Sequence, residues 1–187
     1  MPYILIFLSA FLLFNGITQN GFGLRFTQTP KKAIKILLSM IFSALISWFI
    51  AYYITSPLGF GVFGVFFIFP ISVICSLCIE IIGNKLYKIS SLQFDSSVYS
   101  AYDGIAFYSS FQTVLFAHTA LQAVLFTLGG TLGFILILII LRGIRTRSEI
   151  EAIPKFFKGQ PLLLVSTGLL SMIFTAITPF VIHIFSR

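Results

Sequence analysis

Two polar clusters interrupt apolar stretches of this 187-residue chain, and their side chains are suited to binding an ion or a small solute. The clusters consist of Asn15, Gln19 and Asn20 in the first half and Ser109, Ser110 and Gln112 in the second half. They fall at matching places in the two halves. Broken apolar segments at corresponding positions are the best sequence pointer to a binding site at the membrane midplane. We therefore predict a midplane polar site formed by these six residues.

The two cysteines, Cys75 and Cys78, form a second candidate for chemistry because a Cys-Ser-Leu-Cys spacing can hold a metal ion. Positions i and i+3 share one face of a helix. However, the apolar run 68–82 contains no turn that would aim both sulfurs at one metal. Ordinary packing of the two thiols and a displaced metal site both remain open. With no further cysteine in the chain, a disulfide framework is not expected.

Glu80 is an acidic residue inside an apolar stretch, where a charge is costly and is by default a functional hypothesis. It would neutralise Arg25 or Lys85, or lie on an ion path. Alternatively, it lies one turn from the cytoplasmic end of its span and reaches the lipid headgroups. No nucleophile–base pair, phosphate-binding loop or dinucleotide fingerprint occurs in the sequence. We therefore predict neither catalytic residues nor a conventional metal site.

The composition indicates an integral membrane protein with one domain over residues 1–187. Hydrophobic residues make up 58% of the chain and charged residues 9%, whereas about a quarter of the residues of soluble proteins are charged. Long apolar stretches without alternation must be helices, because a helix satisfies its own backbone groups in lipid. The predicted spans are about 3–20, 34–54, 58–83, 101–118, 120–141 and 161–185. The first span is expected to be retained, since it lacks the features of a cleaved signal peptide.

The basic residues predict the orientation of these spans. Eleven of the twelve Lys and Arg residues follow spans one, three and five, and Arg187 alone falls on the other side. Cytoplasmic loops carry the Lys and Arg excess, so both termini are predicted to lie outside the cytoplasm. The net charge of +7 is thereby explained by topology, and we expect no nucleic-acid partner.

An odd number of spans in each half requires that a duplicated unit be inverted. We predict two inverted three-helix repeats, at about 1–90 and 95–187, with the first and fourth helices broken. Gly129 and Gly133 have the Gly-xxx-Gly spacing that allows close helix approach. The ordinary tolerance of membrane helices for glycine explains them equally well. Trp48, Tyr52 and Tyr53 are predicted to belong to an interfacial aromatic belt.

Several segments resemble the RnfA/NqrE family, which comprises six-span subunits of the ion-translocating Rnf and Nqr electron-transport complexes. The similarity lies in Ile144–Arg147, in Ile153–Gly159, in Thr167–Phe174 and in Tyr3–Phe7. Asn15, the Lys31-Lys32 pair, Glu80 and Leu121–Ala123 also agree in order and spacing. The predicted outside N-terminus resembles this family rather than the sister RnfE/NqrD subunit, which has the opposite orientation.

The resemblance implies a partner and a cofactor. Family members pair with the inverted RnfE/NqrD-like sister subunit, and each of the two supplies two cysteines to an intramembrane [2Fe–2S] cluster. The cysteine positions fall near Arg25 and Gln112 in this chain, where no thiol is present. Arginine and glutamine do not replace thiolates at such a cluster. We therefore do not expect ligation at these two positions, although the resemblance implies the cluster.

Two functions remain open from the sequence. The first is a non-catalytic or electron-transferring membrane subunit of an Rnf/Nqr-type oxidoreductase, located in a bacterial cytoplasmic (inner) membrane beside its sister subunit. The second is a free-standing transporter or channel on the same inverted repeat, with the midplane polar site binding a small solute or ion. A complex subunit should co-purify with partners, whereas a transporter should be stable alone or as a homodimer and should move solute in liposomes.

Overall fold

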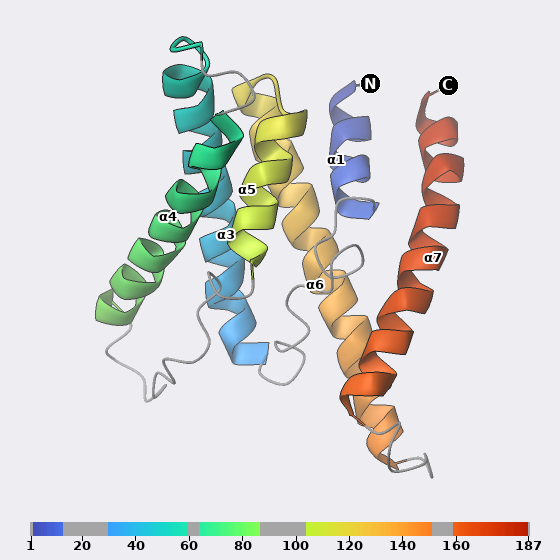
Figure 1. Ribbon diagram of the computed structural model, residues 1–187. Coiled ribbons are helices and arrows are strands. Elements are labelled where there is room, and N and C mark those ends of the chain that lie inside the picture. Colours follow the sequence, from blue (N-terminus) through green and yellow to red (C-terminus); the bar gives the residue numbers. More distant parts are fainter. Residues whose placement is uncertain (1, 13–29, 60–63, 87–103, 151–158, 187) are drawn as a thin grey trace. The chain divides into compact units, whose positions relative to one another are not determined.

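The computed structural model describes residues 2–12, 30–59, 64–86, 104–150 and 159–186, and the regular structure in these ranges is entirely helical (Figure 1). This confirms the predicted all-helical class. The α-helices are α1 (Pro2–Leu12), α3 (Pro30–Ile50), α4 (Gly64–Leu86), α5 (Ile105–Phe116), α6 (Ala120–Ile150) and α7 (Gln160–Ser186). A short π-helix, η2 (Ala51–Thr55), continues α3.

Three of these helices are long and apolar enough to cross a bilayer, as an integral membrane protein requires. Their spanning segments are Leu37–Thr55, Ala120–Ser148 and Pro161–Val181. The other predicted spans correspond, within the described residues, to the shorter apolar helices Tyr3–Leu12, Phe66–Cys78 and Ile105–Phe116. Helix α5, with twelve residues, is about 18 Å long, whereas the hydrocarbon core is about 30 Å thick. The apolar segment Phe66–Cys78 belongs to the 23-residue helix α4, which is about 34 Å long, so its length alone would allow α4 to cross. The inverted six-span repeat therefore remains a prediction.

The fourth helix differs from the prediction. We predicted a break at the polar residues Ser109–Thr113, but α5 runs without interruption from Ile105 to Phe116. The hydroxyls of Ser110 and Thr113 donate to the carbonyls of Ala106 and Ser109 at 2.8 Å. Because each hydroxyl is satisfied one turn back on its own helix, the polar residues need no break in the backbone. The first predicted break, around Asn15–Asn20, lies outside the described residues.

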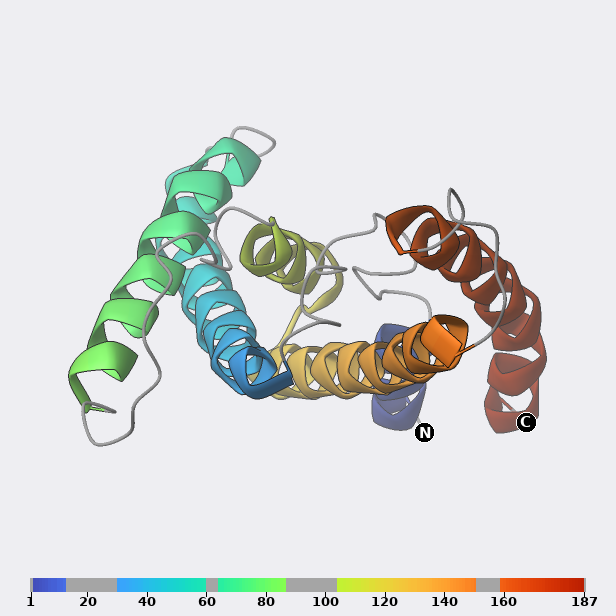
Figure 2. The same ribbon diagram turned by 90° about the horizontal axis from the view of Figure 1, so that it is seen from below.

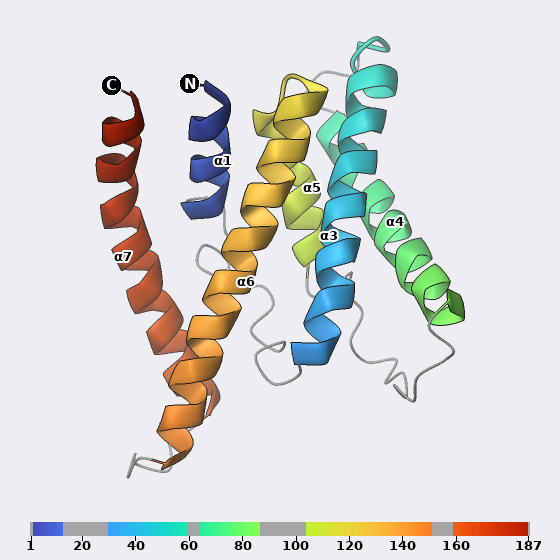
Figure 3. The same ribbon diagram turned by 180° about the vertical axis from the view of Figure 1, so that it is seen from behind.

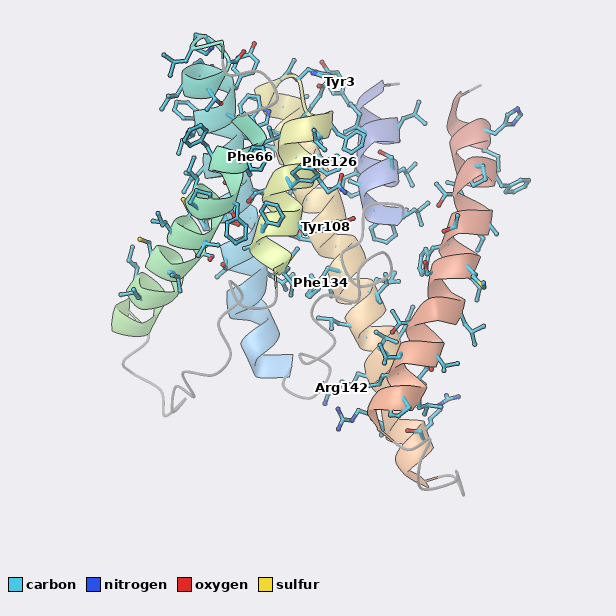
Figure 4. The ribbon with its side chains drawn as sticks, viewed as in Figure 1. Tyr3, Phe66, Tyr108, Phe126, Phe134 and Arg142 are labelled. Carbon is cyan, nitrogen blue, oxygen red and sulfur yellow. The ribbon has the colours of Figure 1, made fainter. Side chains whose placement is uncertain are left out.

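The fifth helix is longer than predicted. We expected the span to end near residue 141, but α6 continues to Ile150. Arg142 and Arg147 therefore extend from a helix rather than from a loop, and Figure 4 labels Arg142 near the C-terminal end of α6. Leu, Ile and Arg are good helix formers, so the change from apolar to basic residues does not end the helix.

The chain forms two compact units, of which the first contains residues 1–30 and 128–187. Within this unit α1 lies between α6 and α7 in the views from the front and from behind (Figures 1 and 3). In the view of Figure 2, α1 lies partly hidden behind α6. The two helices are in contact at Gly129 of α6. A Cβ atom at Gly129 would lie 2.6 Å from the Phe7 carbonyl oxygen and 3.1 Å from the Ala10 Cβ. Glycine is therefore required at position 129 for this close approach, which was one of the two interpretations that the sequence left open.

The second unit contains residues 31–127, including α3, η2, α4, α5 and the first turns of α6. Helix α4 packs along α5, where the rings of Phe69 and Phe107 meet edge to face at 5.2 Å. Trp48, at the end of α3, packs with Ala117 and Ala123. Its indole N–H donates to the Ala117 carbonyl oxygen at 2.7 Å. We predicted an aromatic belt that included Trp48, but this side chain is 6% exposed. Its indole N–H is satisfied inside the unit, whereas Tyr52 and Tyr53 are 50% and 57% exposed. The aromatic belt itself stays a prediction.

Candidate functional site

Helix α5 carries the described half of the predicted midplane polar site. Ser110 is fully buried, whereas Ser109 and Gln112 are half-buried. Tyr108, which is labelled in Figure 4, is buried one turn before Gln112 and forms a side-chain hydrogen bond with it. Ser109 and Gln112 share one face of the helix because they are three residues apart. The structure thus brings the second polar cluster together on one helix.

The other half of the predicted site lies outside the described residues. Asn15, Gln19, Asn20 and Arg25 all belong to this region, so the joining of the two clusters remains a prediction. Glu80 lies on α4 near its C-terminal end, as predicted, and its side chain is likewise outside the described part. The proposed partners of Glu80 therefore remain a prediction.

Gln112 has an unsatisfied acceptor, which distinguishes it from the other described members of the polar site. Its Oε1 atom is buried and has no hydrogen-bond partner among the described residues. A buried amide oxygen without a partner costs about 1–3 kcal/mol, so a water molecule or a hydrogen-bond donor at this atom would be stabilising. An amide oxygen is also a ligand for hard cations. Gln112 can therefore bind water, a donor or a hard cation.

Cys75 and Cys78 share a face of the continuous helix α4, as the spacing predicted. Cys75 is half-buried and Cys78 is exposed, so neither thiol is fully buried in a core. The described residues contain no group of three or more His, Cys, Asp or Glu side chains arranged for a metal ion. Two thiols alone do not complete the coordination of zinc or of an iron–sulfur cluster.

Helix α3 carries a row of buried serines that was not predicted from the sequence. Ser39, Ser43 and Ser47 recur at every fourth residue, and each is at most 1% exposed. The spacing of four was the signal that could have revealed this face. The Ser43 hydroxyl donates to the Met40 carbonyl at 3.2 Å, whereas the buried Ser47 Oγ lacks a partner within the described ranges. Small hydroxyl residues of this kind allow close packing of membrane helices.

Relatives of this chain share one description, the RnfA component of an ion-translocating oxidoreductase complex. The RnfA protein of Pasteurella multocida is 30% identical over 190 residues, covering 94% of this chain and 96% of the relative. The chain belongs to the RnfA family of ion-translocating oxidoreductase complexes. The RnfA protein of Buchnera aphidicola subsp. Baizongia pistaciae is 26% identical, with coverage of 93% and 94%. That of Azoarcus sp. strain BH72 is 24% identical, with coverage of 69% and 67%. No family model matches the chain.

The [2Fe–2S] cluster implied by the RnfA/NqrE resemblance does not fit the residues of this RnfA homologue. The position near the second family cysteine is occupied by Gln112, whose buried oxygen is a hard ligand. Iron–sulfur clusters require thiolates or, in some centres, imidazoles. The first position, Arg25, is a cation by sequence. We therefore assign no electron-transfer step to Arg25 or Gln112.

Proposed function

We propose that this chain is the RnfA-type membrane component of an ion-translocating oxidoreductase complex and that it pairs with an inverted sister subunit. The observation that carries the proposal is the 30% identity to a protein of that description over nearly the whole length of both chains. A match of this extent includes the loops as well as the apolar helices. It is therefore stronger support than shared hydrophobicity alone.

Exposed apolar side chains support a location in lipid beside partner subunits. Phe66, Met172 and Phe180 are 74%, 72% and 69% exposed. Only 17% of the spanning segment of α7 is buried within the chain. Apolar surface of this extent is unfavourable in water and marks contact with membrane or protein. The proposed surroundings are the bacterial cytoplasmic membrane and the other subunits of the complex.

The proposed contribution of this chain is structural or ion-conducting. The residues near the family cysteine positions are not thiols, so electron transfer through four shared thiolates has no support from this chain. The buried polar groups of α5 and α3 instead supply acceptors inside an apolar protein. In membrane proteins such groups mark the paths of ions and protons or hold helices together.

The test is purification of the tagged chain from its native membrane in a mild detergent, followed by mass spectrometry of the co-purifying proteins and iron analysis. We expect subunits of an ion-translocating oxidoreductase complex in the purified sample. A tagged, unrelated membrane protein of similar size serves as the control for nonspecific capture. Recovery of the chain alone or as a homodimer would contradict the proposal, and solute flux in liposomes would then be measured.

A further inference from the structure

A pocket of about 440 Å³ lies in the second compact unit, where α3–η2 and α5 end. Its lining residues, all described, are Trp48, Ala51, Tyr52, Ser56, Val114, Ala117 and His118. Ligand pockets of small molecules have volumes of about 300–1,000 Å³, so there is space for a small organic group. The pocket is separate from the residues of the predicted midplane site.

The walls of the pocket are held in place by local contacts. The hydrogen bond from Trp48 to Ala117 joins the end of α3 to the end of α5. The Tyr52 ring stacks on the Trp48 indole, with centroids 5.1 Å apart and ring planes 13° apart. On the opposite wall, the His118 backbone N–H donates to Gln122 Oε1 at 3.0 Å. The Gln122 N–H is capped in turn by Thr119 Oγ1 at 3.4 Å. The pocket is therefore preorganised by its own unit.

The backbone at the pocket favours a positive charge. Both η2 and α5 terminate there, and neither has a basic residue in its last turn. The C-terminus of a helix carries a partial negative charge of about half an elementary charge, and its last carbonyls lack partners within the helix. Some carbonyls at the end of α5 already have hydrogen-bond donors. Thr113 O accepts the Ala117 N–H, and Ala117 O accepts the Trp48 indole N–H. At the end of η2, Ala51 O accepts both the Ser56 N–H and the Thr55 hydroxyl, and Ser56 O accepts the Gly59 N–H. The two helix ends therefore favour a cation through their partial negative charge rather than through unpaired carbonyls.

The side chains point to the same kind of ligand. Among the described residues, no Asp, Glu, Lys or Arg lines the pocket, so an anion would find no permanently charged partner there. Tyr52 is 50% exposed and Trp48 stands behind it, which provides aromatic surface for a cation. The volume is too large for a bare metal ion. The pocket also lies at the end of Leu37–Thr55, a segment long and apolar enough to cross a bilayer, so we expect lipid headgroups at this level.

We propose that this pocket binds an organic ammonium group against Tyr52 and the C-terminal ends of η2 and α5. The ammonium is carried either by a phospholipid headgroup or by a soluble amine, and the chemistry of recognition is the same. The π-helical turn at Ala51–Thr55 is consistent with a binding role, since π-turns are frequent at functional sites. This inference does not depend on the proposed complex.

Intrinsic fluorescence provides a direct test because Trp48 is the single tryptophan of the chain and lines the pocket. Choline chloride is titrated into the purified full chain in lipid nanodiscs made of phosphatidylglycerol. Sodium chloride at equal ionic strength and 3,3-dimethyl-1-butanol, the neutral isostere of choline, serve as controls. We expect a saturable change with choline alone. An equal response to the isostere, or no saturable binding by fluorescence and calorimetry, would overturn the proposal.

A matched pair of variants tests the aromatic contact. Tyr52→Leu removes a ring that lines the pocket, whereas Tyr53→Leu removes the adjacent exposed ring, which does not line it. We expect the dissociation constant for choline to rise about two- to fivefold in Tyr52→Leu and to stay unchanged in Tyr53→Leu. Tyr52→Phe should retain binding because its π-face remains. Equal weakening by both leucine variants, with helicity unchanged by circular dichroism, would contradict the assigned site.

The source of the ammonium is distinguished by the lipid composition. Nanodiscs that contain phosphatidylethanolamine should abolish the choline response if the natural occupant is a lipid headgroup, because the headgroup then fills the pocket. If the response persists in these nanodiscs, the ligand is a soluble amine. Both results presuppose the ammonium site and identify its occupant.

Discussion

At the residue scale, a few positions distinguish this fold from a generic bundle of apolar helices. Gly129 and Gly130 are adjacent in the sequence, yet their surroundings differ. A Cβ at Gly129 would collide with the backbone of α1, whereas a Cβ at Gly130 would meet nothing within 4 Å. The same residue type therefore serves packing at one position and has no steric requirement at the next.

This contrast predicts opposite effects of two alanine substitutions. Gly129→Ala should lower the free energy of unfolding by about 1–3 kcal/mol, since the new methyl group displaces α1. Gly130→Ala should leave it unchanged or raise it by up to about 1 kcal/mol, because alanine is the better helix former. Circular dichroism during unfolding in mixed micelles measures both. Equal stability of the two variants would show that α1 does not pack on Gly129.

Trp48 leads to a second prediction at this scale. Trp48→Phe removes the indole N–H that bonds to Ala117 and leaves a small cavity, so we expect a loss of about 1–3 kcal/mol of unfolding free energy. The matched control is Phe49→Leu, because Phe49 is 56% exposed and should change stability by less than about 0.5 kcal/mol. The two variants are compared by circular dichroism. A stable Trp48→Phe protein would mean that the indole contact is dispensable.

At the scale of the elements, the apolar segments predicted the helices well, and their ends less well. The run of basic residues after Leu141 suggested a loop, but it forms the last turns of α6. On α7, the hydroxyls of Ser166 and Thr167 donate to the carbonyls of Leu162 and Leu163 on their own helix. Local hydrogen bonds of this kind compete with contacts between helices and are invisible in the hydropathy pattern.

The orientation of the helices is tested by cysteine labelling in a background with Cys75→Ser and Cys78→Ser. If both termini lie outside, an impermeant thiol reagent should label Ala120→Cys and His183→Cys in intact cells. Arg147→Cys should react only after lysis, because the basic end of α6 is predicted to be cytoplasmic. All three positions are exposed, so accessibility within the chain does not limit labelling. The inverse labelling pattern would reverse the predicted topology.

At the scale of the whole molecule, the chain is a member of the RnfA family whose cysteines do not lie where the resemblance implies cluster ligands. The chain covers nearly the full length of its Pasteurella multocida relative but contains only Cys75 and Cys78. These cysteines lie one turn apart on α4 rather than at the two positions implied by the resemblance. The chain thus belongs to the family but lacks thiols at the positions where the resemblance implies ligands of a [2Fe–2S] cluster.

This difference predicts the behaviour of restored cysteines. The double variant Arg25→Cys/Gln112→Cys supplies two thiols, whereas a [2Fe–2S] cluster needs four ligands. The purified variant should therefore bind no stoichiometric iron by itself, and iron should appear only with a sister subunit that brings its own thiols. Iron content and visible absorbance of the variant, with and without co-expressed partner, measure this. Iron bound by the variant alone would contradict the predicted pairing.

The sequence alone determined the membrane class, the approximate positions of the helices and the family resemblance, because hydropathy and residue order are local properties. Tertiary structure decided the continuity of α5, the burial of Trp48 and the different roles of Gly129 and Gly130. It also revealed the pocket, whose two walls are 69 residues apart at the Trp48–Ala117 hydrogen bond. Contacts over such separations depend on how helices pack, and packing is not encoded in the hydropathy of any single segment.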